Sequence, residues 1–381
     1  MARVESGSDG SDPVDGATRR IDRRTVIAAS AGFLTLTLPG NLAMAQSATP
    51  EPDPEPDPEP DPTAGGDANT GTGDFTLYSG RNEALVGPFI ERFAEASGAT
   101  VDVRYGSTGE LAATILEEGE NTPASLFFAQ DAGALGLLAA DGRFQDLPEA
   151  VLNLVDPRFR DPQGRWVGVT GRARVLAYNT EQVADEELPA SVRELIDPVW
   201  QGRVGWAPEN ASFQSFVTAF RLIDGDEAVR SWLEAMIAND TVNFADSNAA
   251  IVQAIASGEI DAGLVNHYYV YVVGREAGAG FPVANHFFAT GDPGALINVA
   301  GVGVVAGAES ADAALSFVEY ALSPAGQEYF AAETFEYPLV EGVAAPAGLS
   351  ALTEIGQPDI DLSDLADLRG TLDLLAEVGL L

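Results

Sequence analysis

The stretch FTLYSGRNEALVGPFIERFAEASGATVDVRYGSTGELAATILEEGENTPASLFFAQDAGALGLLAA, residues 75–140, alternates short apolar runs with longer amphipathic segments. The runs typical of strands are 75–78, 100–104 and 125–128. Each is followed by a segment whose apolar residues recur at helical spacing: 83–96, 109–118 and 132–140. Three successive β-α units predict a parallel sheet covered by helices.

The same alternation continues to the C-terminal part of the chain. Further strands are predicted at 174–178, 202–206, 261–265 and 299–305. Further helices are predicted at 212–223, 228–238, 248–256, 311–321 and 324–331. These are too many units for one small sheet, so we expect two α/β lobes facing a cleft, which is a common place for ligands to bind.

Composition excludes several classes of site. The chain has 381 residues, 46% of them hydrophobic, with no cysteine and only two histidines. Disulfides, zinc–thiolate sites and cysteine nucleophiles are therefore excluded. The net charge of −38 disfavours nucleic acid and anionic membrane surfaces as partners.

The N-terminal region reads as an export signal followed by a spacer. Arg23-Arg24 precedes an apolar run and a small-residue cleavage motif at 43–45, so residues 1–45 are predicted to be a twin-arginine signal. An uncleaved signal anchor is the alternative. Residues 46–73 contain EPDPEPDPEPDP, which predicts a stiff, solvated, acidic linker. We therefore expect an exported protein whose folded part begins near residue 74.

Polar residues cluster in the loops that lead from strands into helices, where ligands bind in open α/β sheets. Asn210, Ser212 and Asn248 lie at predicted helix starts, where free backbone amides favour anions. The alternative is that these side chains only cap their helices.

A pair of tyrosines follows a predicted strand in the stretch NHYYVY, residues 266–271. The pair could be two core aromatics. The functional interpretation is that the two phenolates bind a hard cation such as ferric iron. A free phenol has a pKa near ~10, which a highly charged cation would lower strongly, and hard cations prefer oxygen donors.

Residues 74–381 resemble the ferric-iron-binding periplasmic proteins of bacterial importers. The motifs that carry this resemblance are LYSGRNE (77–83), EEG-x-x-TPA (117–124), FFAQDAGALG (127–136), GRARVLAYN (171–179), GRVGWAP (202–208), LVNHYY (264–269), DPGAL (292–296) and EYPLV (336–340). Their order along the chain makes the resemblance specific.

The resemblance implies a type II two-lobed clamshell in which each lobe is a sheet flanked by helices and two strands cross between the lobes. The chain is expected to cross near 172–178 and to return near Val299. Lobe 1 would comprise 74–172 and 299–348. Lobe 2 would comprise 173–298 and 349–381.

The resemblance also implies a site. Ferric iron would be bound by Tyr268 and Tyr269, with a synergistic anion (carbonate, phosphate or citrate) completing its coordination. The residues at the family's anion-binding positions are Asn210, Ala211, Ser212, Asn248 and Asn266. Arg172 matches an arginine in the family's cleft.

This chain departs from the family pattern at three positions. Asn82 stands where some members have a histidine ligand, and Gln130 stands where some have a glutamate ligand. A third tyrosine, which other members carry near the position of Asn210, is missing. The neighbouring carboxylates Glu83 and Asp131 are further candidate ligands.

The two histidines are expected to be structural. His267 adjoins the tyrosines, but its side chain should point away from theirs, in a packing or supporting role; metal ligation is the alternative.

The implied function is capture of ferric iron outside the cytoplasm by a monomeric, non-enzymatic protein that delivers it to an ABC permease and its ATPase. One alternative is a binding protein of the same fold for an anionic organic or phosphorylated solute gripped by Arg172. A second is a cleft enzyme using Asp131, Glu83 or Glu209 as acid and base. The sequence contains no nucleophile elbow, Walker-type phosphate loop or HExxH motif in its support.

Overall fold

The fold was examined in a computed structural model that describes residues 73–381. The predicted export signal and the linker up to residue 72 lie outside the described residues. The strands are β1 (Phe75–Ser79), β2 (Val101–Tyr105), β3 (Leu126–Ala129), β4 (Val167–Asn179), β5 (Val204–Trp206), β6 (Val242–Asn243), β7 (Ala262–Asn266), β8 (Val283–His286), β9 (Ile297–Val304) and β10 (Tyr337–Pro338).

The helices alternate with the strands over most of this region. They are α1 (Glu83–Ser97), α2 (Thr108–Glu118), α3 (Ala132–Ala140), α4 (Glu149–Leu152), α5 (Ala211–Asp224), α6 (Asp226–Ala238), α7 (Asn248–Ser257), α8 (Tyr268–Ala277), α9 (Ala311–Ala321), α10 (Pro324–Tyr329) and α11 (Leu368–Glu377). None of the helices between residues 73 and 381 combines the length and hydrophobicity that a bilayer crossing requires.

The long strand β4 joins the two halves of the structure. The strand order is β2-β1-β3-β9-β4-β7-β5-β6, with β8 and β10 also paired to β4. The first part of β4 pairs with β9 and β10, and its last part, Arg174 to Asn179, pairs with β7 and β8. Because β4 belongs to both sets of strands, its residues stand where the two halves meet.

The predicted parallel sheet is confirmed for the first three strands, since β1 pairs in parallel with both β2 and β3. In the second half, β5 pairs in parallel with β6 and β7. The strands between these sets, β9 and β4, run antiparallel to their neighbours. The sheet is therefore mixed, because these two long strands carry the chain between the halves and back.

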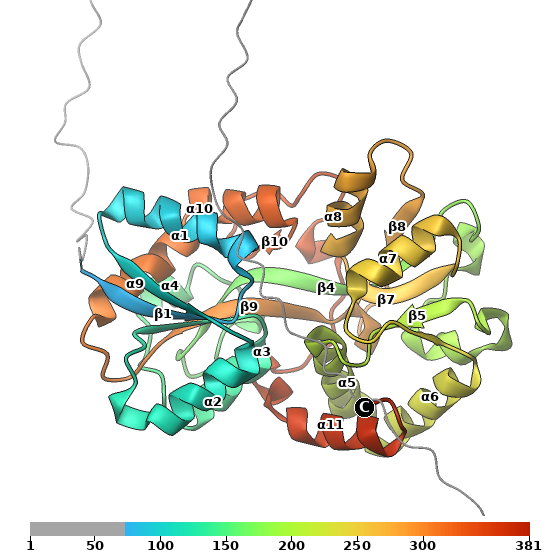
Figure 1. The fold of residues 1–381 in the computed structure, drawn as a ribbon, viewed down its shortest axis with the longest axis horizontal. Coiled ribbons are helices and arrows are strands. Elements are labelled where there is room, and N and C mark those ends of the chain that lie inside the picture. Colours follow the sequence, from blue (N-terminus) through green and yellow to red (C-terminus); the bar gives the residue numbers. More distant parts are fainter. Residues whose placement is uncertain (1–72) are drawn as a thin grey trace, which may run out of the picture. The chain divides into compact units, whose positions relative to one another are not determined.

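Helices cover both faces of each half (Figure 1). In the first half, α1 and α9 cover one face, where Phe89, Phe93 and Phe317 make edge-to-face contacts, and α2 and α3 cover the other. In the second half, α7 and α8 lie on one face, and α5, α6 and α11 lie on the other. All four tryptophans are buried.

The C-terminal segment contacts both halves. The sequence predicted that it packs on the second lobe, and α11 does pack on α5. The turn before it, Leu362–Ala366, packs on α3 of the first half. Two glycines of α3 allow this approach, since a Cβ at Gly136 would stand only 2.5 Å from the Ser363 carbonyl oxygen.

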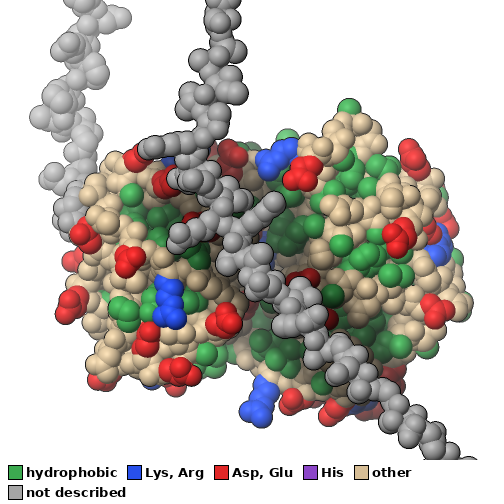
Figure 2. Space-filling view, in the orientation of Figure 1, with side chains coloured by type: hydrophobic (Ala, Val, Ile, Leu, Met, Phe, Trp, Pro, Cys, Tyr) green, Lys and Arg blue, Asp and Glu red, His purple; other side chains and the backbone are tan. Residues whose placement is uncertain are grey.

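Acidic side chains are spread over the visible face, and basic ones are few (Figure 2). The acidic residues are thus distributed over both halves and do not form one cluster on this face. Three arginines, Arg81, Arg172 and Arg174, are buried inside the protein.

Candidate binding site

Nine of the twelve predicted site residues line one small cavity of about 90 Å³. They are Gln130, Asp131, Arg172, Asn210, Ala211, Ser212, Asn266, Tyr268 and Tyr269. These residues come from the ends of β3 and β7, from the middle of β4 and from the starts of α3, α5 and α8. A larger cavity of about 540 Å³, lined by residues around Arg160 and Tyr337, contains none of them.

Helix starts supply several of the lining residues. The Asp131 side chain caps α3 by accepting a hydrogen bond from the amide of Ala134 at 3.2 Å. Asn210 caps α5 in the same way by accepting from the amide of Ser212 at 3.0 Å. The helix-cap interpretation is therefore correct for Asn210. The N-termini of α3 and α5, which carry the positive ends of the helix dipoles, both lie at this cavity.

The tyrosine pair begins a helix. The sequence interpretation placed Tyr268 and Tyr269 at the end of a strand and left the residues after them unassigned, but β7 ends at Asn266 and Tyr268 is the first residue of α8. Val270 and Val273 of this helix are buried against the core. The run of β-branched and aromatic residues resembles a strand, and packing of this apolar face outweighs that local preference.

The two phenol rings stack on each other. Their centroids are 4.5 Å apart with an angle of 28° between the planes. Tyr268 is buried, and Tyr269 is half-buried. Burial raises the pKa of Tyr269, and the neighbouring Tyr268 raises it further. Tyr269 is therefore protonated at neutral pH unless a bound cation displaces its proton.

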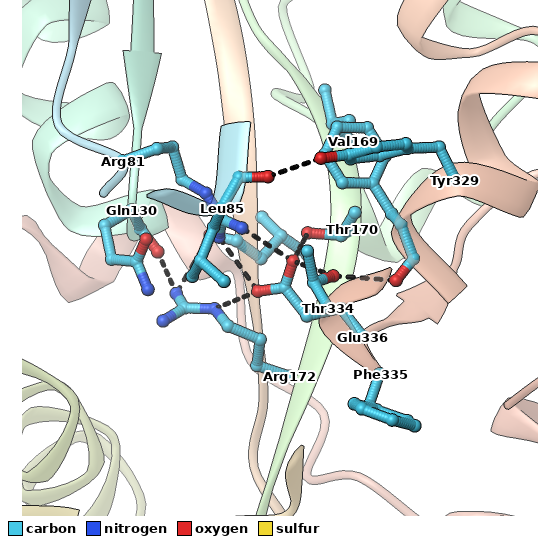
Figure 3. Close-up of polar contacts among 12 residues, drawn as sticks. Arg81, Leu85, Gln130, Val169, Thr170, Arg172, Tyr329, Thr334, Phe335 and Glu336 are labelled. Atoms are coloured by element: carbon cyan, nitrogen blue, oxygen red, sulfur yellow. Dashed lines mark hydrogen bonds and ion pairs between the residues drawn. The ribbon is translucent and has the colours of Figure 1, made fainter. Parts of the chain in front are cut away.

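Two arginines of β4 are buried beside the cavity. Arg172 and Arg174 are two residues apart, so they project from the same face of the strand. Arg172 lines the cavity and donates to the carbonyl oxygens of Gln130 and, at 3.4 Å, Val299. Its Nε lies 3.9 Å from the carboxylate of Glu336 (Figure 3).

Arg174 has no carboxylate partner within residues 73–381 at the 4.0 Å limit for an ion pair. It donates to the carbonyl oxygen of Leu264 at 2.9 Å and to the hydroxyl of Ser212 at 3.4 Å. Its guanidinium also lies 5.5 Å from the ring centroids of Phe213 and Phe216. Burial lowers the pKa of Arg174 to about 9, against the opposing attraction of the tyrosines.

A buried ion pair between Arg81 and Glu336, which was not predicted from the sequence, lies next to Arg172. Arg81 donates to both carboxylate oxygens of Glu336, at 2.8 and 2.7 Å (Figure 3). Thr170 and Thr334 each donate a hydroxyl to Glu336 at 3.1 Å. Burial alone would raise the pKa of Glu336, but Arg81 lowers it below its usual range.

Only the motifs themselves could have drawn attention to this pair. Arg81 lies in the LYSGRNE motif directly before Asn82 and Glu83, which were predicted site residues. Glu336 is the first residue of the EYPLV motif. Their sequence separation of 255 residues hides the contact.

Three predicted residues do not line the cavity. Asn82 is exposed and caps α1 by accepting from the amide of Ala84 at 2.8 Å, and Glu83 is exposed on the first turn of that helix. Asn248 is buried, and its Oδ1 accepts from the amide of Asn266 at 3.3 Å. Asn248 therefore holds the backbone of Asn266, which lines the cavity, without lining the cavity itself.

The donors that remain suit a hard cation together with an anion. The described residues hold no cluster of three or more histidine, cysteine, aspartate and glutamate side chains that could bind a metal ion. The cavity instead presents two phenols and the half-buried Asp131, whose pKa is raised by burial. His267 is fully buried and hydrogen-bonded to backbone groups, as expected for a supporting residue.

Comparison with known proteins places the chain in a family. Residues 121–355 match the model of the bacterial extracellular solute-binding proteins. The chain belongs to this family. The Fe(3+)-binding periplasmic protein of Serratia marcescens is 31% identical over 83% of this chain and 94% of its own length. The major ferric iron-binding protein of Neisseria meningitidis is 29% identical over 81% of this chain and 93% of its own.

Comparison with solved structures finds the same kind of protein. Iron-bound HitA from Pseudomonas aeruginosa has a TM-score of 0.75 and 32% identity, covering 80% of this chain and 99% of that one. The Trichodesmium protein IdiA (FutA), solved with iron and citrate, has a TM-score of 0.69 and 27% identity, covering 81% and 100%. The predicted resemblance and the two-lobed α/β fold are thereby confirmed for this solute-binding protein.

Proposed function

We propose that this solute-binding protein captures ferric iron between its lobes, through the phenolates of Tyr268 and Tyr269 and a small anion. The observation that carries the proposal is the stacked tyrosine pair in a small cavity that also faces two capped helix starts and a buried arginine. Its relatives in Serratia marcescens and Neisseria meningitidis are ferric-iron-binding proteins by name, which supports the same cargo.

The charges around the cavity are the reason for proposing that an anion binds there. Arg81 is neutralised by Glu336, whereas Arg174 has no acidic partner in the described part of the chain. A buried charge without a partner is costly. An anion at the starts of α3 and α5 would compensate it and would fill coordination positions that two phenolates leave open. Asn210, Ala211, Ser212, Asn248 and Asn266 are the proposed anion-binding set, with Arg172 beside them.

Asp131 is the strongest candidate for a further iron ligand, because it is the one carboxylate lining the cavity. Gln130 also lines the cavity but offers a neutral amide, which is a weak ferric ligand. Asn82 and Glu83 would reach the iron only if their loop moved.

The small volume of the cavity favours iron over the alternative cargo. Sites for organic ligands of drug size usually occupy ~300–1,000 Å³, whereas this cavity measures about 90 Å³. That space suits a metal ion with carbonate or phosphate. Citrate or a phosphorylated organic solute would require a wider opening between the lobes.

Transport is proposed by analogy with the family. The exported chain would work as a monomer at the outer face of the cytoplasmic membrane and deliver iron to an ABC permease and its ATPase. Lobe 1 would comprise 74–172 and 299–348, and lobe 2 would comprise 173–298 and 349–381. Closure would be a hinge motion at the crossing strands.

Thermal unfolding distinguishes the two cargoes. Residues 46–381 would be heated with ferric nitrilotriacetate and phosphate, and separately with a panel of sugar phosphates. A ligand at 100 times its dissociation constant stabilises the native state by ~2.7 kcal/mol. We expect a rise in melting temperature with ferric ion and none with the organic phosphates. The reverse pattern would identify the protein as an organic-anion carrier.

A further inference from the structure

His267 connects the tyrosine pair to other parts of the fold. Its backbone amide donates to the carbonyl oxygen of Ala173 at 3.0 Å. Its Nδ1 accepts from the amide of Ala173 at 3.1 Å. Residue 267 is therefore bonded twice to the strand residue that stands between Arg172 and Arg174.

The second ring nitrogen makes a contact with the first half of the structure. Nε2 of His267 lies 2.8 Å from the carbonyl oxygen of Phe335. Since Nδ1 must accept from Ala173, the proton resides on Nε2, which donates to Phe335. The two contacts together require one tautomer of a neutral imidazole.

Phe335 is itself held in an uncommon conformation. It has a φ of 56°, in the left-handed region, directly after the π-helical turn Phe330–Thr334. This conformation is uncommon for a residue other than glycine. The next residue is Glu336, which binds Arg81 and lies near Arg172 (Figure 3).

The imidazole thus contacts three parts of the site: the tyrosine pair, the crossing strand β4 and the segment that carries Glu336. It directly precedes Tyr268, whose ring it meets edge-on at 5.8 Å, and it also packs on the ring of Tyr337 at 4.7 Å. Ala173 places it on the crossing strand, and Phe335 places it beside the Arg81–Glu336 pair. Loss of the ring contacts would leave the buried amide of Ala173 or the part-buried carbonyl of Phe335 without its partner.

We propose that His267 is a positioning residue that holds the tyrosine ligands in register with the Arg81–Glu336 pair across the crossing strand. It acts through the Nε2–H bond to Phe335 and does not touch the cargo. The role rests on the proposed function, because the quantity that it controls is the retention of bound ferric ion.

Three substitutions separate the two ring contacts. Asparagine at 267 can place an acceptor where Nδ1 stands, and so keep the bond to Ala173, but it cannot reach Phe335. Glutamine can place a donor where Nε2 stands, and so keep the bond to Phe335, but it leaves the amide of Ala173 without an acceptor. Phenylalanine keeps the ring and removes both bonds.

The experiment loads each variant with ferric ion and phosphate and follows release to a competing chelator by the loss of visible tyrosinate–iron absorption. Wild type, His267→Asn, His267→Gln and His267→Phe would be compared, with His286→Gln as the control. His286 has its Nε2 2.7 Å from the carbonyl oxygen of Pro189, away from the cavity. Urea unfolding of each unloaded variant gives its stability.

We expect His267→Asn and His267→Phe to release iron about five- to tenfold faster, because both lack the hydrogen bond to Phe335 that controls release. His267→Gln should remain within about twofold of wild type although its stability is reduced. A merely structural role would make the release rate follow stability, with Gln and Asn alike. That result, or wild-type release rates in all three variants, would overturn the assignment.

Failure of the proposed function has a different signature. Wild-type protein that acquires no visible absorption with ferric ion would contradict iron capture itself, and the role of His267 in retaining iron would fall with it. Wild-type protein that binds iron, with variants that do not differ in release, would overturn the role of His267 alone.

Discussion

Arg174 is the residue whose environment most needs a ligand. It is buried, its Nε has no hydrogen-bond partner among residues 73–381, and its guanidinium lies 5.5 Å from the ring centroids of both Phe213 and Phe216. Its contact with Ser212 connects it to the wall of the cavity. In the unloaded protein this charge opposes folding, whereas with an anion in the cavity it favours binding. The two effects can be measured separately.

Arg174→Gln should therefore change binding and stability in opposite directions. We expect the dissociation constant for ferric ion with phosphate to rise at least about tenfold, since bonds to charged groups contribute ~1.5–3 kcal/mol. The unloaded protein should be as stable as wild type or more stable, because an unpaired buried charge is removed. Isothermal calorimetry and urea unfolding measure the two quantities. Arg230→Gln, a surface arginine paired with Glu377, is the control; equal affinities in the two variants would contradict this role.

The tyrosines should make iron capture depend on pH. Burial raises the pKa of Tyr269, so its proton must leave when iron binds at neutral pH. Binding should release about two protons from the phenols, and affinity should fall as the pH falls. The anion can itself exchange protons when it binds, and this contribution to the proton count can be identified by repeating the measurement with several different anions. Tyr269→Phe should release about one proton fewer in a pH-stat titration, and an unchanged count would exclude phenolate ligation by Tyr269.

Contacts between elements rely on small residues where backbones meet. At the C-terminal segment, the turn Leu362–Ala366 lies against α3, and the following helix α11 lies against α5. Both α3 and α5 start at the cavity. The segment therefore connects the two helices whose N-termini face the cavity from opposite lobes.

Gly136→Ala tests this contact. A Cβ at this position would meet backbone atoms of Ser363 at 2.5 and 2.9 Å, which cannot be relieved by turning a side chain. We expect a loss of ~1–3 kcal/mol in unfolding free energy, typical of overpacking. In Gly109→Ala, on α2, the added Cβ has open space around it, and stability should be unchanged or slightly higher. Urea unfolding of both variants decides, and equal stabilities would contradict the close approach.

At the scale of the whole molecule, the sequence predicted the alternation of strands and helices well. Helix α9 was predicted with its observed limits, 311–321, because its apolar spacing is regular. Helix α8 was missed, since tyrosine and valine side chains favour strands locally and only packing reveals the helix. The antiparallel course of β9 and β4 was also missed, because strand direction depends on connections that span the whole fold.

The site was predictable because its residues lie in motifs shared with the family or in loops at predicted helix starts. The cavity brings together Tyr268, Tyr269 and seven other predicted residues. The local sequence did not predict the Arg81–Glu336 pair, nor that Arg174 has no carboxylate partner within residues 73–381. Those properties depend on which distant segments surround a charge, as the separation of Arg81 and Glu336 illustrates.

Tyrosinate coordination of ferric iron is the central claim, and visible spectroscopy tests it most directly. Residues 46–381 would be titrated with ferric citrate, alongside Tyr268→Phe, Tyr269→Phe and the control Tyr271→Phe. Tyr271 lies on the same helix, but its hydroxyl bonds the carbonyl oxygen of Gly348 and it does not line the cavity. We expect a broad visible band in wild type and in Tyr271→Phe, and its loss in the other two variants. A wild-type protein that stays colourless, or a band that survives both cavity substitutions, would contradict the account.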